Sequence, residues 1–197
     1  MKYAIVDTET TIFEKGHPYS KCNKLVVVGN VDRYGKHHFT FSSSDIVSEI
    51  QDYIDPGYTL VGSNFKFDLA WLRNAGVKIP TDIKIWDIQL AFFMLQAQRR
   101  VMPSVDEMAE YYGVEKKLPF IKEKYWDNGI DTDQIPLDEL LQYLKQDLDS
   151  TEQIFLKQVE EFKQYPKLLQ LFKIHCKDLV VLEEIQRNGL YYNKDKA

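Results

Sequence analysis

The chain has 197 residues, of which 44% are hydrophobic and 28% are charged, and its formal net charge is −5. This composition is that of an ordinary globular domain with a full core, and it excludes a protein whose overall positive field attracts nucleic acid. No apolar run approaches the roughly 20 residues of a membrane span, and the N-terminus lacks the apolar core of a signal peptide, so we expect a cytoplasmic protein without a membrane partner.

The first half of the chain is predicted to form short strands interrupted by helices. β-Branched, apolar runs indicate buried strands, and a turn at residues 32–35 joins two of them as an antiparallel hairpin. Asn64 and Asp87 are placed to cap two of the helices. We expect strands at residues 2–6, 24–31, 36–41, 59–62 and 83–86, and helices at 45–54, 65–74 and 88–95.

The second half is predicted to be mostly helical. Ser104 and Glu107 have the spacing of a capping box at the start of a helix that ends near Gly113. Residues 116–136 look irregular, and long helices are expected at 137–162 and 166–189. The order of the elements predicts an α/β fold in which helices flank a mixed sheet. Functional sites of such sheets collect at the carboxyl ends of the strands.

The two cysteines, Cys22 and Cys176, lie far apart in the sequence. They fit neither a disulfide framework nor the spacing of a zinc site. We therefore expect two buried free thiols in a reducing compartment.

Asp7 and Glu9 follow the apolar run of the first strand. Because residues i and i+2 of a strand point to the same face, their carboxylates are expected side by side. Adjacent anions raise each other's pKa unless a cation lies between them, and hard divalent cations take oxygen ligands. A single Asp-x-Glu at a polar strand end is nevertheless common by chance, so the rest of the chain must decide its meaning.

Two further residue pairs extend this pattern. Asn64 and Asp68 open the helix after the fourth strand and share one of its faces, and Tyr143 and Asp147 are spaced in the same way in the long helix. Asp147 lies among leucines, and a carboxylate beside a packed face needs a partner. Each pair alone also fits an ordinary structural role, either a helix cap with a first-turn carboxylate or two residues at the edge of the core.

Together, the motifs Asp7-Thr8-Glu9, Asn64-x-x-x-Asp68 and Tyr143-x-x-x-Asp147 resemble the three exonuclease motifs of the DEDD 3′–5′ exonucleases. The last motif is of the tyrosine subtype, since Gln142 holds the position that a histidine occupies in the other subtype. The order and spacing look like the proofreading domain of family A DNA polymerases, especially bacteriophage-type ones, and residues 179–190 resemble the helix that leads into the polymerase domain.

This resemblance implies a ribonuclease H-like fold, a mixed β-sheet flanked by α-helices. It implies an exonuclease domain at residues 1–165 and, at residues 166–197, a C-terminal helix that begins the connection to a polymerase domain. That polymerase domain would be a partner absent from this chain, and a phage protein would work in the cytoplasm of a bacterial host cell.

The resemblance also implies hydrolysis of the terminal phosphodiester with two divalent metal ions, Mg²⁺ or alternatively Mn²⁺. Asp7, Glu9 and Asp147 would hold one ion, and Asp7 would bridge to a second ion that Asp68 reaches directly or through water. Tyr143 would orient the attacking water. It is not assigned as the main base, because a phenol titrates at about 10.

The implied substrate is the 3′ end of single-stranded DNA. Phe13 occupies the position of an apolar wedge between the last two bases, and an ordinary loop aromatic explains it equally well. Lys66 could equally contact a phosphate or be a solvated side chain. Arg99 and Arg100 lie where the family has an arginine that contacts phosphate, but a solvated basic turn explains them better. The full set of expected substrate contacts is Thr8, Thr10, Phe13, Asn64, Lys66, Phe67, Arg99 and Arg100.

Two other functions stay open. A tyrosine-type DEDD 3′–5′ exoribonuclease would use the same carboxylates, so these residues cannot separate RNA from DNA. A catalytically silent nuclease fold that serves as a binding module predicts lost carboxylates, whereas all four and the tyrosine are present. The leading expectation is therefore a proofreading 3′–5′ exonuclease that acts on single-stranded or frayed DNA ends.

Overall fold

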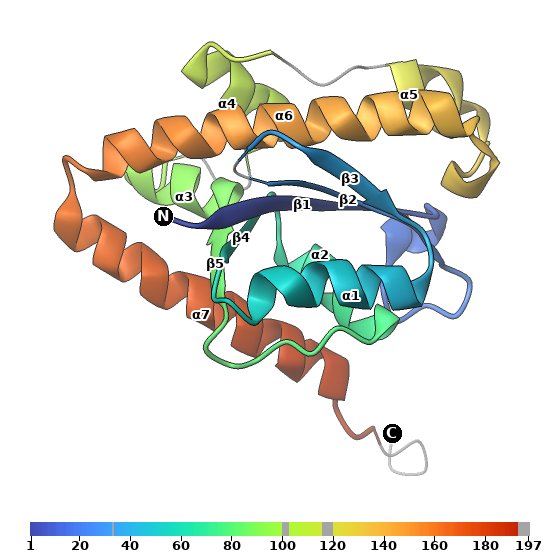
Figure 1. Ribbon diagram of the computed structural model, residues 1–197, viewed down its shortest axis with the longest axis horizontal. Coiled ribbons are helices and arrows are strands. Elements are labelled where there is room, and N and C mark those ends of the chain that lie inside the picture. Colours follow the sequence, from blue (N-terminus) through green and yellow to red (C-terminus); the bar gives the residue numbers. More distant parts are fainter. Residues whose placement is uncertain (33, 100–102, 116–119, 193–197) are drawn as a thin grey trace.

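A five-stranded mixed sheet forms the centre of the computed structural model, which describes residues 1–32, 34–99, 103–115 and 120–192 (Figure 1). β2 is antiparallel to both β1 and β3, whereas β4 and β5 run parallel to β1. The expected α/β fold with an antiparallel hairpin is confirmed. The strands are β1 (Tyr3–Thr10), β2 (Leu25–Asp32), β3 (His37–Thr40), β4 (Thr59–Gly62) and β5 (Lys84–Asp87), in the spatial order β3-β2-β1-β4-β5.

Helices cover both faces of the sheet. In Figure 1, α6 lies across one face, α1 and α2 lie against the other, and α7 runs past the edge formed by β5. In the part of the chain that the structure describes, no helix is both long and apolar enough to cross a membrane. The helices are α1 (Ser43–Ile54), α2 (Lys66–Ala75), α3 (Ile88–Leu95), α4 (Val105–Tyr112), α5 (Phe120–Lys124), α6 (Leu137–Phe162) and α7 (Pro166–Asn188), with short 3₁₀ helices at Phe13–Gly16, Trp126–Asn128 and Thr132–Gln134.

Trp86 of β5 joins the sheet to the two long helices. Its ring makes edge contacts with Phe155 and Phe162 of α6 and with Phe172 of α7, at centroid distances of 5.2, 5.5 and 4.7 Å. Its indole N–H donates to Gln158 Oε1 at 3.0 Å, so the buried polar atom is paired. α7 thus packs into the same core as the sheet, while the division of the chain at residue 165 stays a prediction.

The long helices, the capping box at Ser104 and the cap at Asp87 are confirmed, but the cap of α2 was wrongly predicted. Asn64 adopts a left-handed backbone conformation with φ of 52°, outside the helix that it was expected to cap. The carboxylate of Asp87 instead accepts from the backbone N–H of Phe65 at 2.8 Å. The irregular stretch contains α5 and two 3₁₀ turns, and residues 116–119 lie outside the described residues.

Candidate active site

β1 places Asp7 and Glu9 on the face of the sheet that α6 covers. Asp7 is paired with Gly29 of β2, and a Cβ built on Gly29 would lie 2.8 Å from Leu144 of α6. Residues directly opposite each other in an antiparallel pair share a face, so Asp7 points toward the same helix. Glu9, two residues on, lies on this face as well and is almost fully buried.

Asp147 of α6 completes a cluster of three carboxylates. One oxygen each of Asp7, Glu9 and Asp147 lies within 4.8 Å of the other two. Two oxygens on opposite sides of a Mg²⁺ ion are about 4.2 Å apart, so small side-chain movements would let all three reach one ion. Three hard oxygen donors in a mostly buried position fit Mg²⁺ or Mn²⁺ and would repel one another without a cation.

Asp68 of α2 approaches the cluster from the other side of β1. Its Oδ1 accepts from the backbone N–H of Thr8 at 3.0 Å and from the Thr8 hydroxyl at 2.7 Å. The side chain is buried, and burial together with the charge of Asp7 raises the pKa of Asp68 well above its usual value, although the Thr8 hydrogen bonds act in the opposite direction. Asp68 therefore lies close enough to Asp7 for the two carboxylates to interact.

Tyr143 lies one helical turn before Asp147 on the same face of α6. Its ring makes an edge contact with Trp126, with the centroids 5.9 Å apart. Burial is the main cause that raises the pKa of the phenol, and the charges of Asp147, Glu9 and Asp7 raise it further. The hydroxyl thus keeps its proton at neutral pH and can donate a hydrogen bond beside the carboxylates.

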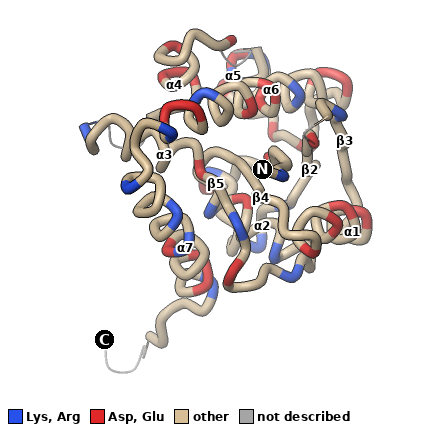
Figure 2. Tube along the Cα trace, turned by 60° about the vertical axis from the view of Figure 1, so that its left-hand side comes forward, with Lys and Arg blue, Asp and Glu red and all other residues tan. Residues whose placement is uncertain are grey.

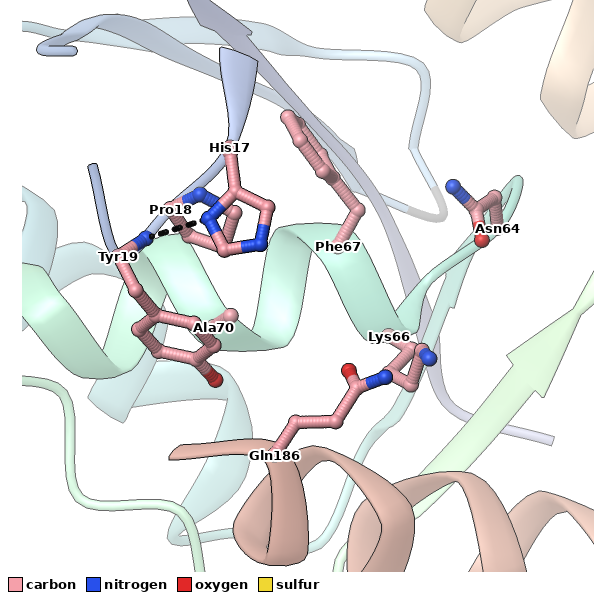
Figure 3. A pocket seen from close by; sticks show the side chains of 8 residues that line it. All are labelled: His17, Pro18, Tyr19, Asn64, Lys66, Phe67, Ala70 and Gln186. Atoms are coloured by element: carbon pink, nitrogen blue, oxygen red, sulfur yellow. Dashed lines mark hydrogen bonds between the residues drawn. The ribbon is translucent and has the colours of Figure 1, made fainter. Parts of the chain in front are cut away.

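Three of the expected substrate contacts, Asn64, Lys66 and Phe67, line a cavity of about 420 Å³ (Figure 3). The cavity lies between the start of α2, the loop after the first 3₁₀ helix and the end of α7. In Figure 3, the amide of Gln186 points toward Lys66 from the opposite wall. The other lining residues are His17, Pro18, Tyr19 and Ala70.

The other expected contacts have different surroundings. Thr8 uses its hydroxyl to hold Asp68, and the hydroxyl of Thr10 donates to the Thr11 carbonyl at 3.1 Å. Phe13 is half-exposed in a 3₁₀ turn, and Arg99 is exposed after α3. Neither residue lines the cavity of Figure 3. Arg100 lies outside the described residues.

Sequence reasoning missed the part of the cavity wall that is formed by Tyr19 and Gln186. An ion pair between the partly buried Arg73 and the buried Glu183 joins the two helices at this wall, because Arg73 Nε of α2 donates to Glu183 Oε2 of α7 at 2.9 Å. The hydroxyl of Tyr19 donates to the other oxygen of Glu183 at 3.4 Å. Glu183 was part of the helix that the sequence suggested as a connection. The signal that the sequence offered for this role was spacing, because Glu183 lies three and four residues after Val180 and Leu179 and so shares an apolar helical face with them.

No family model matches the chain. DNA polymerase I of Borreliella burgdorferi is 25% identical over an alignment of 154 residues, and the match covers 76% of this chain and 16% of the polymerase. The chain thus spans a small part of the length of this curated relative.

Solved structures match over nearly the whole chain. NrnC of Brucella melitensis bound to pGG aligns with a TM-score of 0.69 and 16% identity, covering 95% of this chain and 85% of that one. The same protein with bound Mg²⁺ aligns with a TM-score of 0.71. Escherichia coli RNase D, an exoribonuclease involved in structured RNA processing, aligns with a TM-score of 0.59 and 16% identity, covering 96% of this chain and 46% of that one. The chain therefore has the ribonuclease H-like α/β fold that these structures share.

Proposed function

We propose that this protein is a metal-dependent 3′–5′ exonuclease that removes nucleotides from the end of a single-stranded nucleic acid. The observation that carries the proposal is the convergence of Asp7, Glu9 and Asp147 within 4.8 Å, with Asp68 close to Asp7. Four carboxylates from one strand and two helices are costly to gather unless cations neutralise them. The fold and the Mg²⁺ in a neighbouring structure support this interpretation.

The four carboxylates have distinct roles in this proposal. Asp7, Glu9 and Asp147 would hold one divalent ion, and Asp68 together with Asp7 would hold a second. When bound, such ions would acidify a water and stabilise the charge on the attacking and leaving oxygens. Thr8 keeps Asp68 oriented through its two hydrogen bonds. Because Asp68 carries a raised pKa, cation binding competes with its proton.

Tyr143 acts as a hydrogen-bond donor in this mechanism. Its raised pKa excludes the phenolate as a base at neutral pH, whereas a protonated hydroxyl can orient the attacking water or a phosphate oxygen. Trp126 packs against the ring and limits its rotation. Asn64, Lys66 and Phe67, which line the cavity of Figure 3, then bind the nucleotide at the end of the strand.

We further propose RNA as the leading substrate, in place of the DNA end expected from the sequence. NrnC and RNase D align with 95 to 96% of this chain, and RNase D is an exoribonuclease. DNA polymerase I favours the second candidate, a proofreading exonuclease on DNA, because the sequence match covers 76% of this chain. That match covers 16% of the polymerase, so it carries less weight for the whole protein's activity.

The test of substrate uses RNA and DNA oligomers of identical sequence, each labelled at the 5′ end. We expect Mg²⁺-dependent shortening from the 3′ end of both strands, with faster shortening of RNA. Faster shortening of DNA, by tenfold or more, would reverse the order of the two candidates while leaving the exonuclease proposal intact.

A further inference from the structure

A second cavity of about 540 Å³ lies at the opposite end of the sheet from the carboxylate cluster. We call it the basic cleft, because its wall contains Lys2, Lys84, Lys173 and Lys177. Asp82 is the acidic side chain of the described wall. The chain as a whole has 25 basic and 30 acidic side chains. The wall of the basic cleft is therefore positively charged in a protein whose net charge is negative.

The lysines of the basic cleft are available to a ligand. In the parts of the chain that the structure describes, none of the four lies within 4.0 Å of a carboxylate. Lys84 Nζ donates to the carbonyl of Gly57 at 3.2 Å, and Lys2 Nζ lies 5.7 Å from the centre of the Tyr58 ring. These contacts hold two of the charges in place without neutralising them.

The strands fix where the basic cleft lies relative to the active site. The parallel strands β1, β4 and β5 begin beside it and end at the active-site edge of the sheet. Lys2 directly precedes β1, while Thr59 and Lys84 are the first residues of β4 and β5. A strand rises about 3.3 Å per residue, so Asp7 lies roughly 15–20 Å from the cleft. Figure 2 shows basic positions on α7, the helix that passes β5 and carries two of the lysines.

We propose that the basic cleft is a second ligand site that binds a nucleotide through its phosphate. Lysine binds phosphate as a compact point charge, and four ammonium groups around one cavity favour an anion. The same wall contains the edges of Ile83, Ile85 and Trp86, which are otherwise buried in the core and give the cleft an apolar floor beside the lysines. The volume is also in the range of small-ligand sites.

Two sources would supply this chemistry, a free mononucleotide such as the product of hydrolysis, or the upstream part of a strand whose 3′ end lies at the carboxylates. The choice of a nucleotide rests on the proposed function, whereas the preference for a phosphate rests on the lysines alone. AMP and a longer RNA oligomer separate the two sources, because AMP cannot occupy both sites at once.

The experiment measures binding of AMP and of the RNA oligomer in EDTA, where the strand is not digested. The cleft variant is Lys173→Gln/Lys177→Gln, and the matched control is Lys157→Gln/Lys167→Gln, which removes the same charge from exposed positions of α6 and α7 outside the cavity. Loss of AMP binding by roughly tenfold in the cleft variant alone supports a free nucleotide. If the loss is confined to the oligomer, the upstream strand is supported, and the slope of log K against log salt falls by about 1.4 for two lost phosphate contacts.

Equal binding of both probes by the cleft variant and the control, or no binding of either probe by the wild type, would overturn the proposal. Mg²⁺-dependent cleavage of a dinucleotide, which is too short to reach the cleft, is expected to be unchanged in both double variants. If the wild type cleaves nothing, the exonuclease proposal fails, whereas binding in EDTA still decides the role of the cleft. Thermal unfolding of each variant checks that the fold is intact.

Discussion

Leu144 of α6 packs directly on the backbone of Gly29 in β2. A Cβ added to Gly29 would lie 2.8 Å from both Cγ and Cδ2 of Leu144 and 3.0 Å from Leu148 Cδ1. The missing side chain thus lets α6 approach the sheet directly opposite Asp7. Since Tyr143 and Asp147 lie on either side of Leu144 in the helix, this close contact brings them to the carboxylates of β1.

Gly29→Ala is therefore expected to destabilise the protein by about 1–3 kcal/mol through overpacking. It also moves α6 outward, so Mg²⁺-dependent cleavage falls by more than the loss of folded protein explains. Urea unfolding and cleavage by fully folded samples measure the two effects.

Leu144→Ala serves as the partner in a double-mutant cycle with Gly29→Ala. Alone, it costs about 2–5 kcal/mol because it leaves a cavity. In the double variant the new methyl group occupies part of that cavity. The destabilisations of the two single variants therefore add up to more than the destabilisation of the double variant. Strict additivity would contradict the contact as described.

Asp87 is expected to affect activity through the position of α2. Its Oδ1 accepts from Gln89 N at 2.9 Å and from Leu90 N at 3.1 Å, while Oδ2 accepts from Phe65 N at 2.8 Å. Asp87→Ala removes the cap of α3, at a cost of about 0.5–2 kcal/mol, and also releases the turn that carries Asn64. KM for an RNA oligomer is expected to rise several-fold.

Ser104→Ala is the matched control for this prediction, because Ser104 caps α4 within a capping box. Loss of this cap lowers the free energy of unfolding by a similar amount. KM is expected to stay at the wild-type level because α4 carries no residue of the candidate site. An equal change of KM in both variants would show that lost stability, and not the position of α2, causes the effect.

Tyr143→Phe is expected to lower kcat by about 10- to 100-fold, the value of one hydrogen bond to a charged group. The pH profile keeps its shape between about pH 6 and 10, because burial, the largest cause, raises the pKa of Tyr143 above its ordinary value and does not depend on the metal ions. Tyr112→Phe is the control, since it removes a hydroxyl that donates to Glu161 at 2.8 Å, away from the site. Disappearance of an alkaline limb in Tyr143→Phe would instead assign the phenol as a titrating base.

The two cysteines are expected to differ in reactivity. Burial raises the pKa of Cys176 to about 12, so very little thiolate forms near pH 8, whereas Cys22 is exposed. Alkylation of the folded protein at pH 8 should modify Cys22 alone, and unfolding in urea should release Cys176. Peptide mass analysis identifies the sites. Equal modification of both cysteines in the folded protein would contradict the packing of α7.

Local rules predict which carboxylates share a face within one strand or helix, whereas the meeting of residues from β1, α2 and α6 was implied by the family resemblance alone. The alternation of a strand puts Asp7 and Glu9 on one face, and helical spacing relates Tyr143 to Asp147. The surroundings of Asn64 could not be placed, because its left-handed backbone depends on Asp87, more than 20 residues away in the chain. The expectation of two buried thiols was wrong for Cys22, since a loop position gives no periodic signal of exposure.

The residues that form the walls of both cavities could not be predicted from the sequence either. Gln186 lines the same cavity as Lys66 because the ion pair between Arg73 and the buried Glu183 joins α7 to α2. Lys2 and Lys177, from distant parts of the sequence, line the basic cleft. No local pattern relates such residues, and only the packing of the complete fold brings them to one cavity.

The most direct test of the account is digestion of a 5′-labelled RNA oligomer by the wild type, by Asp7→Ala and by Asp52→Ala, each with Mg²⁺ and with EDTA. Asp52 is an exposed carboxylate of α1 and controls for the change of charge. We expect a ladder that shortens from the 3′ end for the wild type and Asp52→Ala with Mg²⁺, and no shortening for Asp7→Ala or in EDTA. Digestion that survives Asp7→Ala, or that proceeds equally in EDTA, would show that the cluster of Asp7, Glu9 and Asp147 is not the catalytic metal site.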